Sequence, residues 1–374
     1  MTNFKYTPGK SFFLPIWGLI FYTGCMKIAL LAPPYLSVPP KAYGGTEKIV
    51  SLLSDGLVDR GHDVTLFATG DSLTRAKLVS IFPEELGNSG LIKGSALMPM
   101  LHFRECFRRS GEFEIIHNHA QYLPMFLSEY SQTPVVHTMH GSFYPHEVPE
   151  DKRKILKTFK GQPFISISDN QRKGLPELNF VATVYNGLDL DEYTYIEKPR
   201  GKYLLWVGRI TEKKGPTEAI DTANKLGMPL VIAAALDPVD RPYFEKEIKP
   251  KVDGKKISFV GELSQTTLDD LYGNAYCTLF PISWHEPFGL VMIESMACGT
   301  PVVGFDIGSV AEVIADGKTG FVINPESGVE GMIHAVREIE RIQRGDCRTH
   351  VVEKFSKEVM VEAYISAYAK IIHG

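Results

Sequence analysis

The sequence lacks the cysteine pattern of a disulfide-stabilised or zinc-binding protein. Its five cysteines are scattered along the chain, and no two of them form a C-x-x-C pair. An odd number of cysteines without paired spacing indicates neither a disulfide framework nor a zinc site. Such cysteine usage is typical of a reducing compartment, so we expect a cytoplasmic protein.

An excess of basic residues is also missing, as are tandem repeats and low-complexity tracts. Lys and Arg number 40 against 44 Asp and Glu, which gives a formal net charge of −4. Proteins that bind duplex nucleic acid usually carry a basic excess or a long basic stripe, so no nucleic-acid partner is expected. With 44% hydrophobic and 22% charged residues, the composition is that of an ordinary soluble globular protein.

Hydrophobic runs long enough to suggest a membrane are confined to the N-terminus. The run "SFFLPIWGLIFYTGC" at 11–25 contains a proline and is shorter than the roughly 20 residues of a membrane-spanning helix. It is either a signal or anchoring segment, or an extension upstream of Met26, where "MKIALLAPP" begins a typical α/β domain. We favour the second interpretation, in which residues 1–25 take no part in the fold.

The remaining chain has the length and the pattern of two α/β domains. Its 374 residues exceed one ordinary core, and two domains of roughly 150–200 residues are expected. Short β-rich runs such as "KIALLA" and "HDVTLFAT" alternate with helical patterns, and a second such series begins at "KYLLWVGR". This alternation predicts βαβ units and parallel sheets. We assign the first domain to 26–190, the second to 200–351, and a final helical stretch, 352–374, that packs back on the first domain.

Ligands of such sheets bind outside the carboxyl ends of the strands, which directs attention to the stretch "HEPFGLVMIESMACG" at 285–299. A strand gives way to a helix there, so the first helical N–H groups and the helix dipole form an anion site. Glu286 precedes the helix, and Glu294 lies roughly 7–8 Å beyond its start. This spacing suits a nucleoside diphosphate sugar, with Glu294 accepting from the ribose and Glu286 from the hexose. The alternative is two exposed glutamates without a ligand.

A second feature, "WVGRITEKKG" at 206–215, places Arg209 and Lys214 just after another predicted strand. A diphosphate leaving group needs its developing charge neutralised, and without a metal this falls to Arg and Lys. The alternative is a solvated basic loop. The two features occur in the same half of the chain and therefore support each other.

Histidines near the ends of two predicted strands raise the question of a metal. His117 and His119 follow one strand, and His137 and His140 follow the next. Four imidazoles could bind a metal ion, but no acidic ligand accompanies them, so no metal is expected.

Two acidic motifs have local explanations. The acid-x-acid pair of Asp189 and Asp191 lies in the predicted linker, which favours turn or cap chemistry over a metal site. Ser309 and Glu312 have the spacing of a capping box and predict a helix start without a catalytic role.

Taken together, these residues resemble the retaining family-4 glycosyltransferases, which have the GT-B fold. The resemblance is carried by Gly208-Arg209, by Lys214-Gly215, and by Glu286 and Glu294 on either side of Phe288-Gly289-Leu290. It extends over nearly the whole chain from Met26, because "KAYGGTEKIVSLL" is similar to the family's first loop and helix, "VYNGLDLDEY" to its interdomain segment and "HTMHG" to its active-site loop. The implied fold is two Rossmann-like, doubly wound parallel-sheet domains with a cleft between them.

The resemblance also implies a role for individual residues. Arg209 and Lys214 would bind the donor diphosphate, Glu286 the transferred sugar and Glu294 the ribose, with the amides of Gly289 and Leu290 near the phosphates and Phe288 also in the donor site. Gly44 and Gly45 would lie in the first-domain loop that approaches donor and acceptor, and His140 would face the sugar. Enzymes of the family generally need no metal, so no cofactor is expected apart from the nucleotide sugar as co-substrate.

The implied reaction is transfer of a hexosyl unit from a UDP- or GDP-sugar to a hydroxyl of a sugar, a lipid-linked sugar or a small molecule, in polysaccharide, glycolipid or natural-product glycoside synthesis. Retention would follow a same-face route, because no carboxylate is obviously placed as a covalent nucleophile. Three alternatives stay open: a sugar-nucleotide epimerase, a non-catalytic nucleotide-sugar-binding protein, and a metal-dependent hydrolase. Peripheral contact with the inner face of a membrane also stays open.

Overall fold

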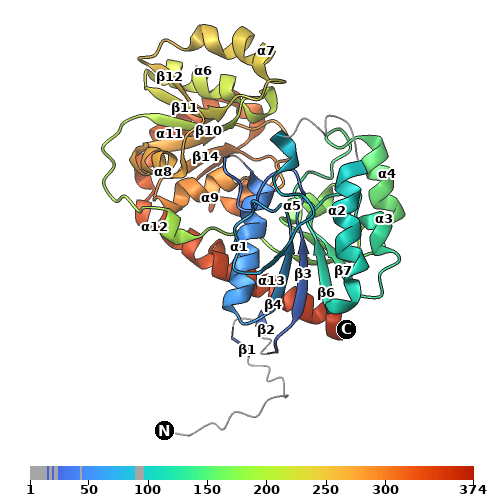
Figure 1. Cartoon of the computed structure of the whole chain (residues 1–374). Helices are drawn as coiled ribbons and strands as arrows, with labels where there is room; N and C mark the ends of the chain where they lie inside the picture. Colours follow the sequence, from blue (N-terminus) through green and yellow to red (C-terminus); the bar gives the residue numbers. More distant parts are fainter. Residues whose placement is uncertain (1–14, 17–18, 21–23, 43, 89–96) are drawn as a thin grey trace, which may run out of the picture.

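The computed structural model describes residues 15–16, 19–20, 24–42, 44–88 and 97–374. The predicted N-terminal extension, 1–25, lies largely outside the described residues, apart from a short antiparallel pair formed by β1 (Pro15–Ile16) and β2 (Leu19–Ile20). From Met26 the chain forms two lobes, each built on its own parallel sheet (Figure 1). The predicted fold class, two Rossmann-like parallel-sheet domains, is confirmed.

The first domain contains a seven-stranded parallel sheet in the order β5-β4-β3-β6-β7-β8-β9. Its strands are β3 (Lys27–Leu31), β4 (Asp63–Phe67), β5 (Lys77–Val79), β6 (Ile115–Asn118), β7 (Val135–His137), β8 (Phe164–Ser166) and β9 (Phe180–Thr183). Helices cover both faces, which explains why the central strands read as nearly continuous apolar runs. Successive residues of β3 face opposite cores, with Ile28 and Leu30 in one cluster and Ala29 and Leu31 in the other.

The helices of the first domain divide between these two cores. They are α1 (Gly45–Asp59), α2 (Leu97–Arg108), α3 (Met125–Ser128), α4 (Glu150–Thr158) and α5 (Asp169–Lys173). Helix α1 buries Ile49 and Leu53 on one face of the sheet, and α2 buries Phe103 and Cys106 on the other. The order of the strands reverses at β3, so α1 follows the strand beside the point where ligands enter such sheets.

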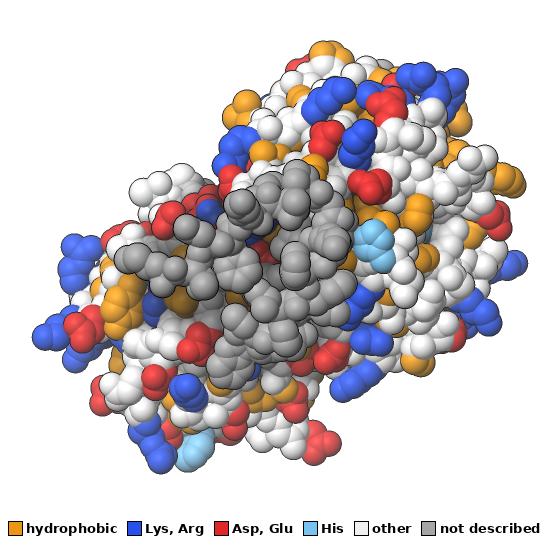
Figure 2. Space-filling model, turned by 90° about the horizontal axis from the view of Figure 1, so that it is seen from below, with side chains coloured by type: hydrophobic (Ala, Val, Ile, Leu, Met, Phe, Trp, Pro, Cys, Tyr) orange, Lys and Arg blue, Asp and Glu red, His pale blue; other side chains and the backbone are white. Residues whose placement is uncertain are grey.

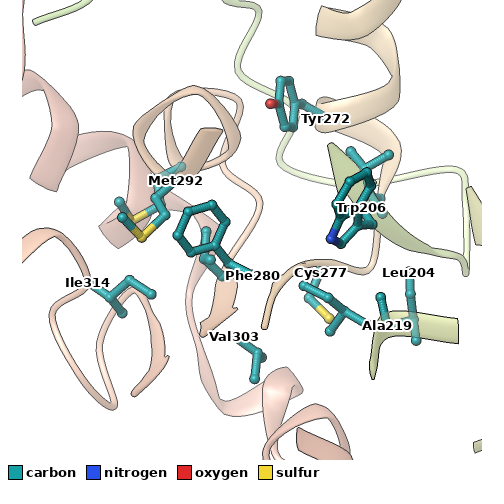
Figure 3. Packing of buried hydrophobic residues seen from close by; sticks show 14 of the residues in the cluster. Leu204, Trp206, Ala219, Tyr272, Cys277, Phe280, Met292, Val303 and Ile314 are labelled. Carbon is teal, nitrogen blue, oxygen red and sulfur yellow. The ribbon is translucent and has the colours of Figure 1, made fainter. Parts of the chain in front are cut away.

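The second domain contains a six-stranded parallel sheet in the order β12-β11-β10-β13-β14-β15. Its strands are β10 (Leu204–Arg209), β11 (Leu230–Ala235), β12 (Ile257–Gly261), β13 (Cys277–Phe280), β14 (Val302–Phe305) and β15 (Gly320–Ile323). Its helices are α6 (Pro216–Leu226), α7 (Arg241–Tyr243), α8 (Gln265–Asn274), α9 (Leu290–Ala297), α10 (Val310–Val313), α11 (Gly328–Arg337) and α12 (Arg344–Lys354). Trp206, Tyr272, Phe280 and Met292 fill the core around the sheet and α9 (Figure 3).

The chain returns to the first domain through its last helix. The predicted stretch 352–374 is divided in the structure, because α12 ends at Lys354 and α13 (Lys357–His373) begins after Ser356, whose hydroxyl accepts the N–H of Val359 at 3.4 Å. Helix α13 packs along α1 and buries Val361, Tyr364 and Tyr368 in the core of the first domain (Figure 1). The two domains are therefore joined by two crossings of the chain.

Two surface properties bear on the expected partners. Acidic and basic side chains are interspersed over the described part of the face in Figure 2. Among the described helices, none combines the length and the apolar composition that crossing a bilayer requires. The absence of a nucleic-acid partner stays a prediction.

Candidate active site

A cleft of about 690 Å³ lies between the two domains, at the carboxyl ends of strands from the second sheet. Its walls include Gly208 at the end of β10, Ala235 at the end of β11 and Phe280 at the end of β13. The structure brings nine of the ten predicted site residues to these walls: Gly44, Gly45, His140, Lys214, Glu286, Phe288, Gly289, Leu290 and Glu294. The tenth, Arg209, is not among the lining residues.

The beginnings of two helices face each other across the cleft. Gly44 is the N-cap of α1 and Gly289 the N-cap of α9, and neither helix has a side-chain cap. A Cβ atom added to Gly45 would lie 3.6 Å from Leu290 Cδ1, so the two helix starts are close together. The first N–H groups of both helices and both helix dipoles therefore favour negative charge in the cleft.

Lys214 is held in position by the turn that connects β10 to α6. The indole N–H of Trp206 in β10 donates to the Lys214 carbonyl at 3.1 Å. Gly215 then takes a left-handed conformation, with φ of +69°, before α6 begins. The Lys214 ammonium donates to Glu286 and lies 5.1 Å from the centroid of the Trp284 ring, a cation–π contact. The predicted cation and the predicted sugar-binding carboxylate are thus adjacent in the cleft.

Arg209 is paired with acidic side chains in this structure, and its predicted contact with the diphosphate stays a prediction. Its Nε donates to Asp240 at 2.5 Å, and Asp237 is 3.9 Å away. Both acids belong to the loop that follows β11, in the sequence "LDPVD". Arg209 ends β10 as expected, its guanidinium contacts these two carboxylates, and the residue is not among those that line the cleft. The run of acids was visible in the sequence, although its position beside Arg209 follows only from the pairing of β10 with β11.

Glu294 is fixed and buried, so the alternative of an exposed helix glutamate is wrong. Its residue is 9% exposed. The carboxylate accepts from the hydroxyls of Tyr193 and Tyr272, each at 3.1 Å, and from the Lys48 ammonium at 3.3 Å. Burial raises the pKa of both tyrosines well above the ordinary value, so they remain donors at neutral pH. Lys48 belongs to α1, and its contact with Glu294 therefore joins the two domains.

Sequence reasoning missed Lys48, Tyr193 and Tyr272. Lys48 follows the Gly44-Gly45 loop by one helical turn, and Tyr193 ends the interdomain segment "VYNGLDLDEY". Both residues therefore lie in stretches on which the resemblance to the family rests. The Phe288 ring packs against Tyr185 and Phe355 in the core and is 2% exposed, and the residue also lines the cleft, so its place in the donor site stays a prediction.

His140 lies in the loop after β7, at the wall of the cleft. Burial lowers its pKa to about 4, so the ring is neutral at pH 7. Its Nε2 is 2.9 Å from His119 Nδ1, and His137 instead contacts Asn118 and Gln162. Within the described chain, no group of three or more His, Cys, Asp or Glu side chains is arranged to hold a metal ion. Metal independence itself stays a prediction.

Of the two acidic motifs, the Asp189–Asp191 pair has its predicted role and the Ser309–Glu312 pair does not. Asp189 caps the turn that follows it by accepting the N–H of Asp191 at 3.2 Å, which confirms its predicted turn chemistry. The capping box is wrong, although a helix does begin after Ser309: the Ser309 hydroxyl donates to the Phe288 carbonyl instead. Glu312 accepts the backbone N–H groups of Asp169 and Asn170, at 2.7 and 2.6 Å. It therefore caps α5 of the other domain.

A second polar contact between the domains adjoins Glu286. The Glu147 carboxylate accepts the backbone N–H of His285 at 2.7 Å and contacts His285 Nδ1 at 2.9 Å. The Tyr144 ring stacks on the His285 ring, with centroids 3.6 Å apart. The residue before the predicted sugar-binding glutamate is thus held by the first domain.

Two Rossmann-like parallel-sheet domains on either side of a cleft are the arrangement of the GT-B fold. Two family models match this chain. The model described as Glycosyltransferase Family 4 matches residues 43–192, and the model described as Glycosyl transferases group 1 matches residues 195–357. The chain belongs to the group 1, family-4 glycosyltransferases, and it is a glycosyltransferase.

Relatives cover nearly the whole chain. An uncharacterized glycosyltransferase of Methanocaldococcus jannaschii is 25% identical, over 92% of this chain and 98% of its own. A D-inositol 3-phosphate glycosyltransferase of Kribbella flavida is 25% identical, over 87% of this chain and 90% of its own. Among solved structures, Anabaena HepE in complex with UDP and glucose has a TM-score of 0.72 at 16% identity, covering 92% of this chain and 100% of that one. The structural likeness shows the GT-B fold.

Proposed function

We propose that this glycosyltransferase transfers a hexosyl unit from a UDP- or GDP-sugar to an acceptor hydroxyl, with retention of the anomeric configuration and without a metal. One observation carries the proposal: Lys214 and Glu286 form an adjacent cation and carboxylate in a cleft onto which two helix N-termini open. The solved structures of the similar Anabaena HepE in complex with UDP and with UDP-glucose support a nucleotide sugar as the donor.

The donor would lie along the second domain. Its diphosphate would accept hydrogen bonds from the backbone N–H groups at the start of α9 and from the Lys214 ammonium. To donate to the diphosphate, Lys214 would have to break its contact with Glu286. Glu286 would then be released to accept from hydroxyls of the hexose. Glu294, already fixed by two tyrosines, would accept from the ribose.

The reaction would take place on one face of the sugar. The bond between the anomeric carbon and the diphosphate oxygen breaks, the acceptor oxygen bonds to the same face of that carbon, and the acceptor proton passes to the leaving diphosphate. Lys214 would stabilise the negative charge that develops on the diphosphate, in place of a metal. His140 would face the sugar from the first domain, and the closed cleft would exclude water and so limit hydrolysis. A covalent glycosyl-enzyme adduct trapped in mass spectrometry would contradict this route.

Calorimetric titration with UDP, GDP and ADP, in the presence of a chelator, tests the donor site. We expect one nucleotide to bind the wild type and Lys214→Ala to weaken binding about 10- to 100-fold, the range of a lost charge-assisted hydrogen bond. The matched control is Lys213→Ala, which removes the same charge from an exposed neighbouring position and is expected to leave affinity nearly unchanged. Arg209→Ala should cost less than Lys214→Ala, because Arg209 would first have to leave Asp240.

The outcomes separate the open alternatives. Binding that disappears with chelator would overturn metal independence, and equal affinity of Lys214→Ala and Lys213→Ala would overturn the diphosphate assignment. Once the base is known, NMR of the product formed with an acceptor determines its anomeric configuration. Formation of an epimer without acceptor would indicate an epimerase, and binding without any turnover would indicate a non-catalytic protein.

A further inference from the structure

Three histidines form a continuous chain that starts at the cleft with the partly exposed His140 and continues through the buried His119 and His117. His140 Nε2 lies 2.9 Å from His119 Nδ1, and His119 Nε2 lies 3.1 Å from His117 Nδ1. The rings of His119 and His140 are stacked, with an interplanar angle of 24°. His117 lies in β6, His119 directly follows that strand, and His140 follows β7, so the parallel pairing of β6 with β7 brings the rings together.

The chain ends inside the first domain on two hydroxyl groups. His117 Nδ1 lies 2.6 Å from the Tyr368 hydroxyl of α13, and His117 Nε2 lies 2.8 Å from Thr138 Oγ1. His117 and His119 are both 0% exposed. Burial lowers the pKa of both rings well below the ordinary value, as it lowers that of His140, so all three are neutral at pH 7.

Neutrality couples the protons of the three rings. A neutral imidazole has one N–H donor and one acceptor nitrogen, so each contact in the chain needs a donor on one side and an acceptor on the other. If His140 donates from Nε2, His119 accepts at Nδ1 and must donate from Nε2 to His117. If His140 accepts at Nε2, every ring carries its proton on Nδ1. The state of His140 Nδ1, which the chain leaves unused, is therefore set by the other rings.

A histidine that is buried for packing alone has different surroundings in this domain. His102 is 1% exposed, and its Nε2 contacts the carbonyl of Ala32, a backbone group without a link to the cleft. His137 is 0% exposed and bonds to Asn118 and Gln162. Among the described residues, hydrogen-bond contacts run from one imidazole ring to the next and reach a cleft-lining residue only in the series His117, His119 and His140.

We propose that His119 is a positioning residue, which holds the His140 ring in place and fixes which of its nitrogens carries the proton. His119 in turn contacts His117, and His117 contacts the Tyr368 hydroxyl of α13, the helix that returns from the second domain, so these groups also influence the position of the proton on His140. The proposal deepens the proposed function and rests on it for the contact between His140 and the sugar. The ring arrangement by itself can be tested without any substrate.

The experiment uses the full chain and four variants. His119→Leu removes both hydrogen bonds, whereas His119→Asn keeps a polar group within reach of His140. Tyr368→Phe removes only the terminal hydroxyl and preserves the buried ring. The matched control is His137→Leu, which removes an equally buried histidine of the neighbouring strand that lies outside the chain.

Two readouts distinguish positioning from folding. In ¹⁵N-histidine NMR spectra at pH 7, we expect His140 of the wild type to occupy one tautomer, and its ring signals to change in His119→Leu and Tyr368→Phe but not in His137→Leu. In transfer assays, kcat of His119→Leu should fall about 10-fold or more, because orientation and tautomer affect the reacting state. The KM for donor should stay within about twofold, since donor binding uses other residues. His119→Asn should restore part of kcat.

Unchanged His140 signals in folded His119→Leu, or equal kcat for His119→Leu and His137→Leu, would overturn the proposal. If His119→Leu does not fold, Tyr368→Phe and His119→Asn decide by the same spectra. Failure of the proposed function looks different: the wild type would neither bind a nucleotide nor transfer a sugar, while the NMR spectra would still report whether the histidine chain controls His140.

Discussion

Two glycines at the ends of one helix allow the geometry around Lys214 to be tested by a single methyl group. Gly215 and Gly227 flank α6, and both have left-handed backbones, with φ of +69° and +70°. A Cβ atom at Gly215 would lie 2.0 Å from the Pro281 carbonyl oxygen, whereas one at Gly227 would meet nothing within 4 Å. Gly215→Ala and Gly227→Ala therefore share the backbone cost and differ only in the steric clash.

The expected magnitudes follow from this difference. A left-handed backbone costs a non-glycine residue about 1–2 kcal/mol, which is all that Gly227→Ala should lose in the free energy of unfolding. Gly215→Ala adds the clash with a backbone atom that cannot rotate away, and forcing extra volume into a packed site typically costs about 1–3 kcal/mol more. The clash also pushes against the loop that leads to Glu286, because the Lys213 carbonyl accepts the N–H of Ser283 at 2.9 Å.

Equilibrium urea unfolding provides the assay. Two of the three tryptophans, Trp206 and Trp284, lie in the second domain, so the change in tryptophan emission that their exposure causes follows the unfolding of that domain. We expect Gly215→Ala to lose roughly 2–5 kcal/mol and Gly227→Ala about 1–2 kcal/mol, and only Gly215→Ala to weaken nucleotide binding in the native state. Equal losses in the two variants, or normal nucleotide affinity in Gly215→Ala, would refute the claim that this close approach positions Lys214.

Three further predictions concern the rest of the molecule. Burial lowers the pKa of His102 and His137 to about 4 from 6.5, so below pH 6.5 the unfolded chain takes up protons that the folded chain does not. The free energy of unfolding therefore falls as the pH drops toward 4, by at most about 3 kcal/mol per ring. Urea midpoints at pH 7, 5.5 and 4.5 measure this fall, and a constant midpoint would contradict it. Glu312→Ala should speed hydrogen exchange at the Asn170 amide roughly fivefold to tenfold, because the variant loses a helix cap worth about 1 kcal/mol. An unchanged exchange rate would show that the contact does not form in solution. Cys25 is exposed and the other four cysteines are buried, so a thiol reagent should modify one cysteine in the native protein and five after denaturation; rapid reaction of a second thiol would be inconsistent with the packing.

The parts of the fold that periodicity determines were predictable from the sequence. The run "KIALLA" contains β3, and "LVMIESMACG" contains α9 and ends with Gly299. A buried parallel strand and a buried helix of this length each leave a local pattern of apolar residues. Lys214, Glu286 and the amides of α9 were found for the same reason: each lies directly after a predicted strand, and the carboxyl ends of parallel strands meet at one edge.

What could not be predicted depends on residues distant in sequence. Arg209 and Asp240 are separated by 31 positions, and only the register of β10 on β11 makes them neighbours. Glu312 reaches α5 of the other domain across 142 positions, so its local spacing after Ser309 suggested a capping box that does not form. A motif reports which groups are available, whereas the partners that compete for each group are set by tertiary packing.

The contacts between the domains differ in strength, and this difference determines where the cleft is able to open. Lys48 with Glu294, His285 with Glu147 and Glu312 with α5 are polar contacts between the domains. Several of them are partly exposed, and an exposed ion pair typically contributes about 1 kcal/mol or less. By contrast, α13 buries a continuous apolar face in the first domain, which costs far more to separate. Leu188 pairs with Phe355 and Lys357 through backbone hydrogen bonds of 2.8 Å, directly where the two crossings of the chain lie side by side. Of these polar contacts only Lys48 with Glu294 involves a residue assigned to the donor, so we expect any change in the angle between the domains to take place around the Leu188 crossing while α13 stays packed on the first domain.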